Sequence, residues 1–311
     1  MSRSPENKIV VITRKTRLAE IIIKFNTINQ AKFYIESLGA DFSDYQIEDQ
    51  IYKCSVSNVE RELRKIAKVQ IIERTYLPNY IFGSNDIVVV VGQDGLVANT
   101  LKYLNNQSVI AINPDPCRWD GVLLPFNVSD ARFVVQDIFN AKRQHKEITF
   151  AKVETNNGQY MYGVNDLFIG PKSHTSARYI IEIDNHKEQQ LSSGIIVSTG
   201  LGSTGWLSSI LAGAKGIAQE QNWAEITLDS NKFDWASNYL CYNVREPFPS
   251  KVTGVSKVFG KISMNNKIVV TSLMPHNGVI FSDGVESDFI EFNSGTKATI
   301  SVADKKGYLV I

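Results

Sequence analysis

Short runs of β-branched and aliphatic residues alternate with segments of helical spacing in the first half of the chain. The runs that predict strands are KIVVITRK (8–15), DIVVVVGQDG (86–95) and SVIAINPDP (108–116). The segments that predict helices are TINQAKFYIESLGA (27–40), which has a glycine near its expected end, VSNVERELRKIAKVQ (56–70) and LVANTLKYLNNQ (96–107). Strands that are apolar throughout and alternate with helices are typical of a parallel sheet covered on both faces. We therefore expect an α/β amino-terminal domain.

The pattern changes near Ile148, where short strands with alternating polarity begin to dominate. Four such segments precede a single predicted helix, WLSSILAGAKGIAQE (206–220), and they are 148–155, 158–170, 177–184 and 192–199. Six more follow it, at 238–244, 260–265, 267–273, 278–284, 288–293 and 297–303. This predicts a β-rich, largely antiparallel carboxy-terminal domain with one embedded helix. The expected domains are 1–145 and 146–311.

Composition and charge narrow the class of protein. Hydrophobic residues make up 43% and charged residues 21% of the 311 residues, as in globular proteins, and the formal net charge of +1 argues against a dedicated nucleic-acid binder. Neither a membrane-spanning run nor the apolar core of a signal peptide is present, so we expect a cytoplasmic protein without a membrane partner. The three cysteines and four histidines are scattered, and their spacing predicts neither disulfides nor a metal site.

A glycine turn, Gly92-Gln93-Asp94-Gly95, follows the run of valines at the expected carboxyl end of a parallel strand, where ligands of α/β sheets bind. Glycines let a ligand approach the backbone, and the next helix offers free N–H groups to a phosphate. An aspartate would repel that phosphate, unless it accepts a proton from an attacking hydroxyl or holds magnesium. A plain strand-to-helix turn with Asp94 at a helix start is the equally open alternative.

A second glycine segment, IIVSTGLGSTGW (195–206), contains a literal G-x-G-x-x-G at Gly200, Gly202 and Gly205. It could be the fingerprint of a Rossmann oxidoreductase, with EITLD (225–229) as a second strand ending at Asp229. That fingerprint normally opens a series of βαβ units, whereas hairpin-like segments flank this one. The flanking segments therefore argue against a Rossmann fingerprint at these three glycines.

Three motifs occur in a fixed order: the turn 92–95, Asn165-Asp166 in GVNDLFIG, and STGLGSTGW (198–206). Together they resemble the G-G-D-G, N-E and S-T-P-T-G-S-T-A-Y signatures of the NAD kinase family, which belongs to the diacylglycerol-kinase-like superfamily. AINPDPCRWDGVLLP (111–125) and NVREPFPS (243–250) resemble the mitochondrial-type branch. The resemblance covers roughly 86–311 and implies an NAD-kinase-like fold, in which Gly200 and Gly205 replace the family's Pro and Ala.

The resemblance implies ATP- and magnesium-dependent phosphorylation of the 2′-hydroxyl of NAD. Asp94 would take the proton of that hydroxyl, and Gly92, Gln93 and Gly95 would lie against phosphates and ribose. The remaining family contacts to NAD match Asn165, Asp166, Thr204, Gly205, Trp206 and Ser209. For the Asn-Asp pair the alternative is an ordinary β-turn, and for Trp206 it is a core tryptophan.

Arg14, in TRKTR (13–17), and Arg118, in the loop with Asp115 and Pro116, follow strands on the same expected edge and are candidates for binding the ATP phosphates. Solvated loops are the alternative for both. The family also implies a homodimer or homotetramer.

Three residues depart from the family pattern, namely Gln93, Leu96 and Ser193. They leave open a kinase for another hydroxyl, such as that of a sugar, nucleoside or lipid, and a non-catalytic nucleotide-binding protein. The segment Arg245-Glu246-Pro247 has no role that its residues predict.

Overall fold

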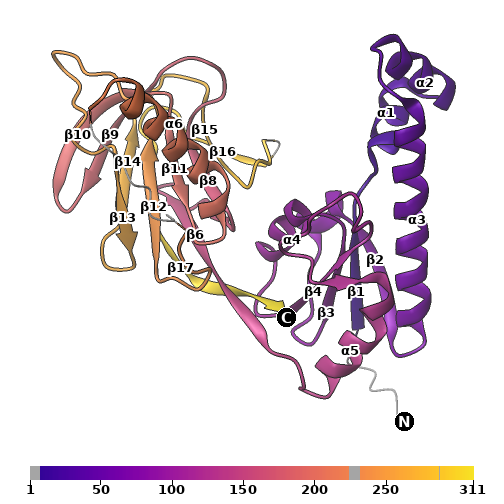
Figure 1. The fold of residues 1–311 in the computed structure, drawn as a ribbon. Helices are drawn as coiled ribbons and strands as arrows, with labels where there is room; N and C mark the ends of the chain where they lie inside the picture. Colours follow the sequence, from indigo (N-terminus) through magenta and orange to yellow (C-terminus); the bar gives the residue numbers. More distant parts are fainter. Residues whose placement is uncertain (1–7, 224–231, 287) are drawn as a thin grey trace. The chain divides into compact units, whose positions relative to one another are not determined.

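The computed structural model describes residues 8–223, 232–286 and 288–311, and these form two compact units. Unit 1 comprises the chain up to Lys146 together with Tyr308–Ile311, and unit 2 comprises Glu147–Gly307 (Figure 1). The last four residues therefore belong with the amino-terminal unit, although the sequence pattern assigns them to the carboxy-terminal domain. Within the described ranges we find no helix whose length and hydropathy would let it span a bilayer.

Unit 1 is built on a parallel sheet with the order β4-β3-β1-β2, and β5 and the end of β17 also pair with β4 in parallel. Its strands are β1 (Lys8–Thr13), β2 (Lys68–Glu73), β3 (Ile87–Val91), β4 (Ser108–Asn113) and β5 (Phe126–Asn127). Its α-helices are α1 (Arg17–Phe25), α2 (Ile28–Ser37), α3 (Phe42–Arg64), α4 (Asp94–Leu101) and α5 (Ala131–Phe139), with 3-10 turns η1 (Arg74–Asn79) and η2 (Val128–Asp130).

The central strands of unit 1 are buried on both faces, which is why they are apolar throughout. One face packs against α3 and α5, through Tyr52, Val59 and Leu63 of α3 and the apolar side of α5. All five residues of β3 are buried. Burial of each such side chain contributes about 1.5–3 kcal/mol to folding, so this stacking dominates the stability of the unit.

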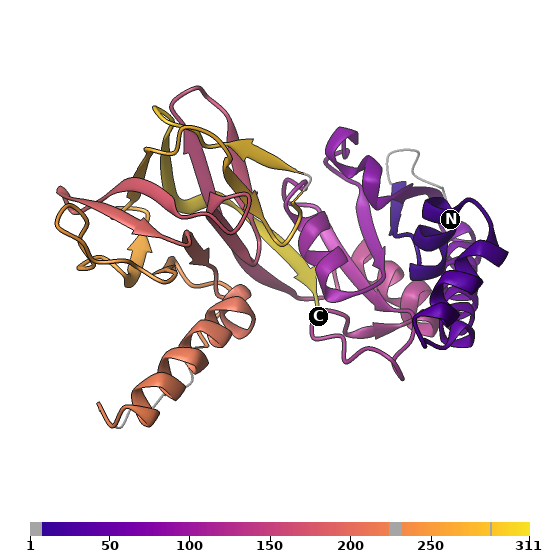
Figure 2. The ribbon, with the colours of Figure 1, turned by 90° about the horizontal axis from the view of Figure 1, so that it is seen from above.

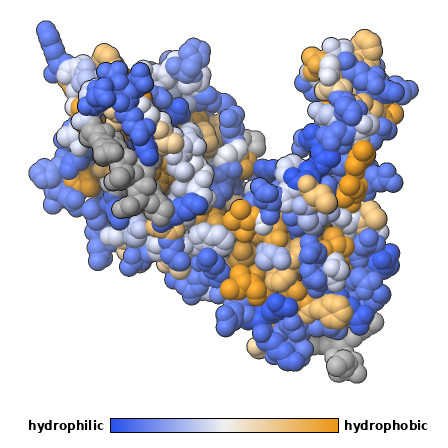
Figure 3. Space-filling model, in the orientation of Figure 1, coloured by the Kyte–Doolittle hydropathy of each residue, from blue (hydrophilic) through white to orange (hydrophobic). Residues whose placement is uncertain are grey.

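A helical arm of α1, α2 and the first turns of α3 extends from unit 1 (Figure 1). Its own small core is Leu18, Ile35 and Phe42. Figure 3 shows apolar side chains on the surface of this arm, where Phe33 and Leu38 are among the most exposed large apolar residues.

The structure corrects the helix predicted over 56–70. α3 begins much earlier, at Phe42, and ends at Arg64, and residues 68–70 lie in β2. Asp41 caps the start of α3 by accepting a hydrogen bond from the Ser43 N–H at 2.8 Å. The predicted helix after the glycine turn also differs, since α4 begins at Asp94 and ends at Leu101. Gly39 has a φ of +74° just after α2, the left-handed conformation that ends helices.

Unit 2 is a sandwich of two sheets. One holds β10-β9-β14-β17 with β6 and β7, and the other is a six-stranded antiparallel sheet with the order β13-β12-β11-β8-β15-β16. The strands are β6 (His145–Thr155), β7 (Tyr160–Gly163), β8 (Asp166–Pro171), β9 (Ala177–Ile183), β10 (His186–Ser192), β11 (Ile195–Ser198), β12 (Tyr239–Val244), β13 (Phe259–Ser263), β14 (Ile268–Ser272), β15 (Gly278–Ser282), β16 (Phe289–Glu291) and β17 (Lys297–Val310). Side chains from both sheets form one apolar core.

A 3-10 turn, η3 (Gly202–Thr204), and the helix α6 (Trp206–Glu220) follow β11, and the bounds of α6 are those predicted. The start of α6 packs closely on the second sheet, where Trp206 and Ile210 lie against Phe168, Ile196 and Val279. Figure 2 shows the rest of the helix extending away from the strands of unit 2. Of its later residues, Ile217 is 61% exposed.

Candidate functional site

The glycine turn of unit 1 lies at the carboxyl end of β3, and α4 starts directly at Asp94. The Asp94 carboxylate accepts hydrogen bonds from the N–H groups of Leu123 (2.8 Å) and Val122 (3.2 Å). Both donors lie in the loop that follows β4, so two neighbouring carboxyl-end loops fix this carboxylate. The bonds to this loop set its orientation, and the residue remains partly exposed.

The two glycines of this turn have different reasons to be glycine. A Cβ on Gly92 would lie 2.6 Å from Cδ2 of Leu96, so the buried Leu96 side chain would have to shift to admit one and its packing favours a glycine there. A Cβ on Gly95 would meet no atom within 4 Å, and Gly95 is exposed. Gly95 therefore offers open backbone to a ligand, whereas Gly92 is buried and its N–H donates to the Ile112 carbonyl at 3.3 Å. Gln93 is the half-buried N-cap of α4, with no capping hydrogen bond from its side chain.

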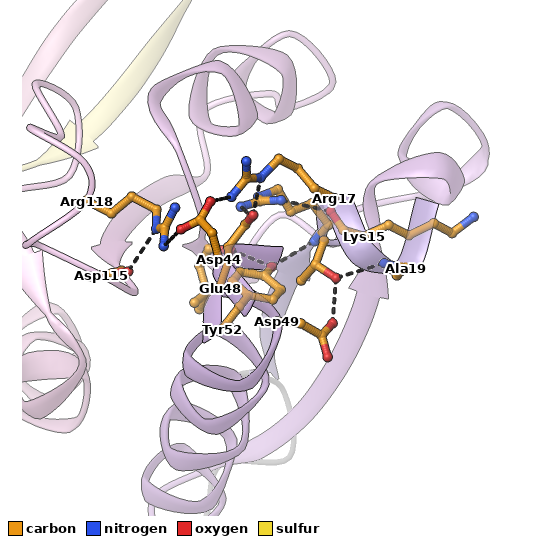
Figure 4. A network of polar contacts seen from close by, with 12 residues as sticks. Lys15, Arg17, Ala19, Asp44, Glu48, Asp49, Tyr52, Asp115 and Arg118 are labelled. Atoms are coloured by element: carbon orange, nitrogen blue, oxygen red, sulfur yellow. Dashed lines mark hydrogen bonds and ion pairs between the residues drawn. The ribbon is translucent and has the colours of Figure 1, made fainter. Parts of the chain in front are cut away.

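Both arginines predicted to bind phosphate are ion-paired with carboxylates inside unit 1. Arg14 contacts Glu48 at 2.9 Å, and Arg118 contacts Asp44 at 2.6 Å (Figure 4). The Arg118 and Arg17 guanidinium groups lower the pKa of Asp44 to about 2 through their hydrogen bonds to it. These acids lie on α3 and were not among the residues that the sequence predicted for the site.

The Asn165-Asp166 pair forms the turn between β7 and β8 in unit 2, and two other segments hold it. The Asp283 carboxylate accepts hydrogen bonds from the N–H groups of Val164 (3.0 Å), Asn165 (2.7 Å) and Asp166 (3.3 Å). On the other side the Thr199 N–H donates to the Asn165 carbonyl at 2.9 Å. Asp283 has a φ of 54°, which aspartate tolerates better than most residues, and its Asp-Gly sequence was the one signal of a special turn.

Asp166 is a half-buried residue of unit 2. Its Oδ1 atom is buried and has no hydrogen-bond partner in the described part of the chain. The pKa of Asp166 is raised to about 7, chiefly by burial; the nearby Ser198 hydroxyl lowers this pKa and the negative charge of Asp283 contributes to the rise. Asp166 therefore keeps its proton to a higher pH than an exposed carboxyl group does.

Gly200 and Gly202 are packing glycines. A Cβ on Gly202 would lie 2.2 Å from the Asn165 carbonyl oxygen and 2.8 Å from Oδ1 of Asp166, and one on Gly200 would lie 2.1 Å from the Asp234 carbonyl oxygen. The glycine segment therefore packs directly against the Asn165-Asp166 turn. Two of the predicted motifs, 165–166 and 198–206, are thus in contact.

Around the start of α6, the predicted contacts Thr204, Gly205 and Ser209 are exposed and remain open to a ligand. Trp206 is partly buried, with its ring stacked on Phe168 at a centroid distance of 5.9 Å and an interplanar angle of 14°. The guanidinium of Arg245 lies over the same indole ring, 5.5 Å from its centroid. Trp206 thus has the packing of a core residue, and Arg245 gains a contact that its sequence context did not predict.

The surroundings of β11 are not those of a Rossmann fingerprint. β11 pairs antiparallel with both β8 and β12, so the glycine segment does not open a parallel βαβ unit. The proposed second strand EITLD, with Asp229, falls in 224–231, outside the described residues. The described residues hold no group of three or more histidine, cysteine, aspartate or glutamate side chains that could bind a metal ion.

Comparison with known proteins gives structural neighbours only. No protein-family model matches the sequence, and no curated protein does. Among solved structures, an NAD kinase from Archaeoglobus fulgidus in complex with ATP matches with a TM-score of 0.57 and 16% identity, over 98% of this chain and 93% of the other. Yeast NADH kinase complexed with NADH matches with a TM-score of 0.55 and 14% identity, over 97% of this chain and 83% of the other. The chain therefore has the fold of the NAD kinases.

Proposed function

We propose that the protein is an ATP-dependent kinase that phosphorylates the 2′-hydroxyl of NAD to give NADP. The observation that carries this proposal is Asp94, a fixed carboxylate at the start of α4 in an NAD kinase fold. Two further sequence motifs of that family, at Asn165-Asp166 and Gly202–Trp206, contact one another in unit 2. The solved neighbours bind ATP and NADH, which supports nucleotides as the ligands of this chain.

Asp94 would act as the general base. The hydrogen bonds from Val122 and Leu123 hold its carboxylate in one orientation, and a carboxylate held in this way can take a proton from an attacking hydroxyl. Gly95 beside it leaves the backbone open, and the N-terminus of α4 offers N–H groups to a phosphate. Most of the rate enhancement in phosphoryl transfer comes from such positioning and charge stabilisation.

The residues fit a magnesium ion that arrives with the nucleotide better than one bound by protein alone. The described residues offer no three-acid cluster, and both oxygens of Asp94 already accept hydrogen bonds. Mg²⁺ is commonly held by one or two carboxylates and the substrate phosphates, and it would neutralise charge on the transferring group. Asp94 would contact the ion through the lone pairs that its two hydrogen bonds leave over.

NAD would bind along unit 2, where Thr204, Gly205 and Ser209 are exposed and Asn165 is half-buried. Trp206, which contacts Phe168 and Arg245, would line the site with the part of its ring that stays exposed. Arg14, Arg118, Gln93 and Gly92 remain the proposed surroundings of the ATP phosphates.

The test is formation of NADP from NAD, ATP and magnesium by the purified protein, with Asp94→Asn alongside. The variant keeps the shape of the side chain but cannot accept a proton, and we expect its kcat to fall by about 10²–10⁴-fold. Glu60→Gln is the control, because it also replaces a carboxylate of unit 1 by an amide, at a residue whose described partner is Arg64 and which lies in no proposed site. Equal turnover by the wild type and Asp94→Asn would refute the role of Asp94.

A second candidate is a kinase of the same fold for a different hydroxyl. The burial of Asp166 favours it, because a carboxyl under the glycine segment is not placed like a surface acid that binds a ribose. Transfer of ³²P from ATP to sugars, nucleosides or lipids, with no NADP formed, would identify that activity. Binding of NAD without any transfer would instead indicate a non-catalytic nucleotide-binding protein.

A further inference from the structure

Three arginines and three acids form one continuous ion-pair network in unit 1 (Figure 4). Arg14 follows β1, Arg17 opens α1, and Arg118 lies in the loop after β4. The acids are Asp44 and Glu48, one turn apart on α3, and Asp115. The contacts are Arg14–Glu48 (2.9 Å), Arg17–Glu48, Arg17–Asp44 (2.8 Å), Arg118–Asp44 (2.6 Å) and Arg118–Asp115 (3.5 Å).

Two hydrogen-bonded connections join the network to the glycine turn 92–95. The Tyr52 hydroxyl accepts a hydrogen bond from the Arg14 N–H (2.8 Å) and donates one to the Val91 carbonyl (2.9 Å), directly before Gly92. The loop that carries Arg118 continues into Leu123, whose N–H holds Asp94. The arginines thus gather at the carboxyl edge of the parallel sheet, where α/β proteins bind their ligands.

The hydrogen-bonding needs of the arginines are not fully met. The Nε–H groups of Arg14 and Arg118 are buried and make no hydrogen bond in the described part of the chain, although Oδ2 of Asp115 lies 3.5 Å from Nε of Arg118. A buried donor without an acceptor costs about 1–3 kcal/mol, so such groups usually mark a place for a missing oxygen. A carboxylate has two oxygens and one negative charge, whereas a polyphosphate offers several linked groups of oxygens and several negative charges.

We propose that Arg14, Arg17 and Arg118 form a binding site for a polyphosphate group, and that Asp44 and Glu48 occupy this site in the absence of ligand. Both carboxylates accept from the same guanidinium N–H groups that would bind phosphate, so ligand and acids compete. Because both acids lie on α3, ligand binding would also release the base of the helical arm. The inference rests on the proposed function only if the polyphosphate is that of ATP.

The arrangement makes an unusual prediction, because removal of acidic residues should tighten binding. Isothermal titration calorimetry of the full chain at low salt would use sodium triphosphate, Mg-ATP and adenosine as separate ligands. We expect Asp44→Asn and Glu48→Gln each to tighten triphosphate or ATP binding by about threefold or more, and Arg17→Gln to weaken it by about tenfold. Adenosine affinity should not change in these variants.

Glu60→Gln is the matched control, since it removes one negative charge from α3 at a site paired only with Arg64 among the contacts described. It should leave affinity unchanged. Glu48 is 4% exposed and its variant could unfold, whereas Asp44 is 42% exposed, so Asp44→Asn carries the test in that case. Tightening for ATP alone identifies a nucleotide as the ligand, and tightening for triphosphate as well shows that phosphates suffice.

The proposal would be overturned if Asp44→Asn bound triphosphate and ATP no more tightly than the wild type, or if Arg17→Gln bound them equally well. The network would then serve only to stabilise the fold of unit 1. Calorimetry does not depend on turnover. A protein that forms no NADP but binds triphosphate more tightly as Asp44→Asn would refute the proposed activity and support this site.

Discussion

The backbone of Gly202 touches that of Asn165 so closely that a Cβ on Gly202 would lie 2.2 Å from the Asn165 carbonyl oxygen. Two motifs that lie far apart in the sequence can thus approach this closely only because residue 202 has no side chain. Since the obstacle is backbone, no rotation of a side chain can relieve it.

Gly202→Ala should therefore destabilise the protein by about 1–3 kcal/mol and raise the KM for NAD. Gly213→Ala is the comparison, because a Cβ there would meet no atom within 4 Å inside α6, and it should stabilise by about 0.5–1 kcal/mol. Urea denaturation measures both. A Gly202→Ala protein as stable as the wild type would show that the glycine segment can move away from Asn165.

Asp283 should matter for NAD binding although it is not in any of the predicted motifs. Asp283→Ala leaves up to three N–H groups of the 164–166 turn without an acceptor, and we expect a loss of at least about 1–3 kcal/mol together with a higher KM for NAD. Asp283→Asn keeps one acceptor oxygen and tolerates the positive φ, so its effect should be smaller. Equal effects of the two variants would argue against hydrogen bonding as the cause.

Asp166 should make stability depend on pH. Its pKa is raised from 3.8 to about 7, so the folded state binds a proton that the unfolded state releases between these values. Stability should therefore fall as the pH rises from about 4 to about 7 and stay reduced above it.

Asp166→Asn removes this term, and we expect it to stabilise the protein at pH 8 by on the order of 2–4 kcal/mol, with little effect at pH 4. Denaturation curves at the two pH values provide the check. A variant that follows the pH dependence of the wild type would show that Asp166 is not the group responsible.

A homodimer or homotetramer remains our prediction for the assembled protein. The exposed outer part of α6, where Ile217 is 61% exposed, is a surface through which unit 2 could associate. Size-exclusion chromatography with light scattering should give a mass above that of one chain, and Ile217→Asp should lower it. A wild-type mass equal to one chain would refute this prediction.

The fold could be predicted in outline because its strongest local signals agree with the final structure. The valines of β3 are buried on both faces, as a continuous apolar run predicts, and α6 has its predicted bounds. The helix predicted over 56–70 failed at its end, because KVQ suits a helix as well as a strand. Pairing with β1, from Lys8 against Lys68 onward, decides in favour of β2.

The candidate site could be predicted only where its residues lie within a motif. Asp94, Asn165 and Gly202 each sit in a recognisable turn. Asp283 and Glu48 do not, since their partners lie far away along the chain, at Asn165 and Arg14. The burial of the Asp166 carboxyl group also depends on the packing of the glycine segment (195–206) against it, and a local sequence pattern does not predict that packing.

The strand β17 has a consequence for how the protein is made. Tyr308 and Leu309, near its end, pair with Ser108 and Val109 of β4 and belong to unit 1. During synthesis the ribosome must therefore add the whole of unit 2 before unit 1 receives its last strand. At about 5–20 residues per second, that interval is on the order of ten seconds, during which one flank of β4 lacks its final neighbour.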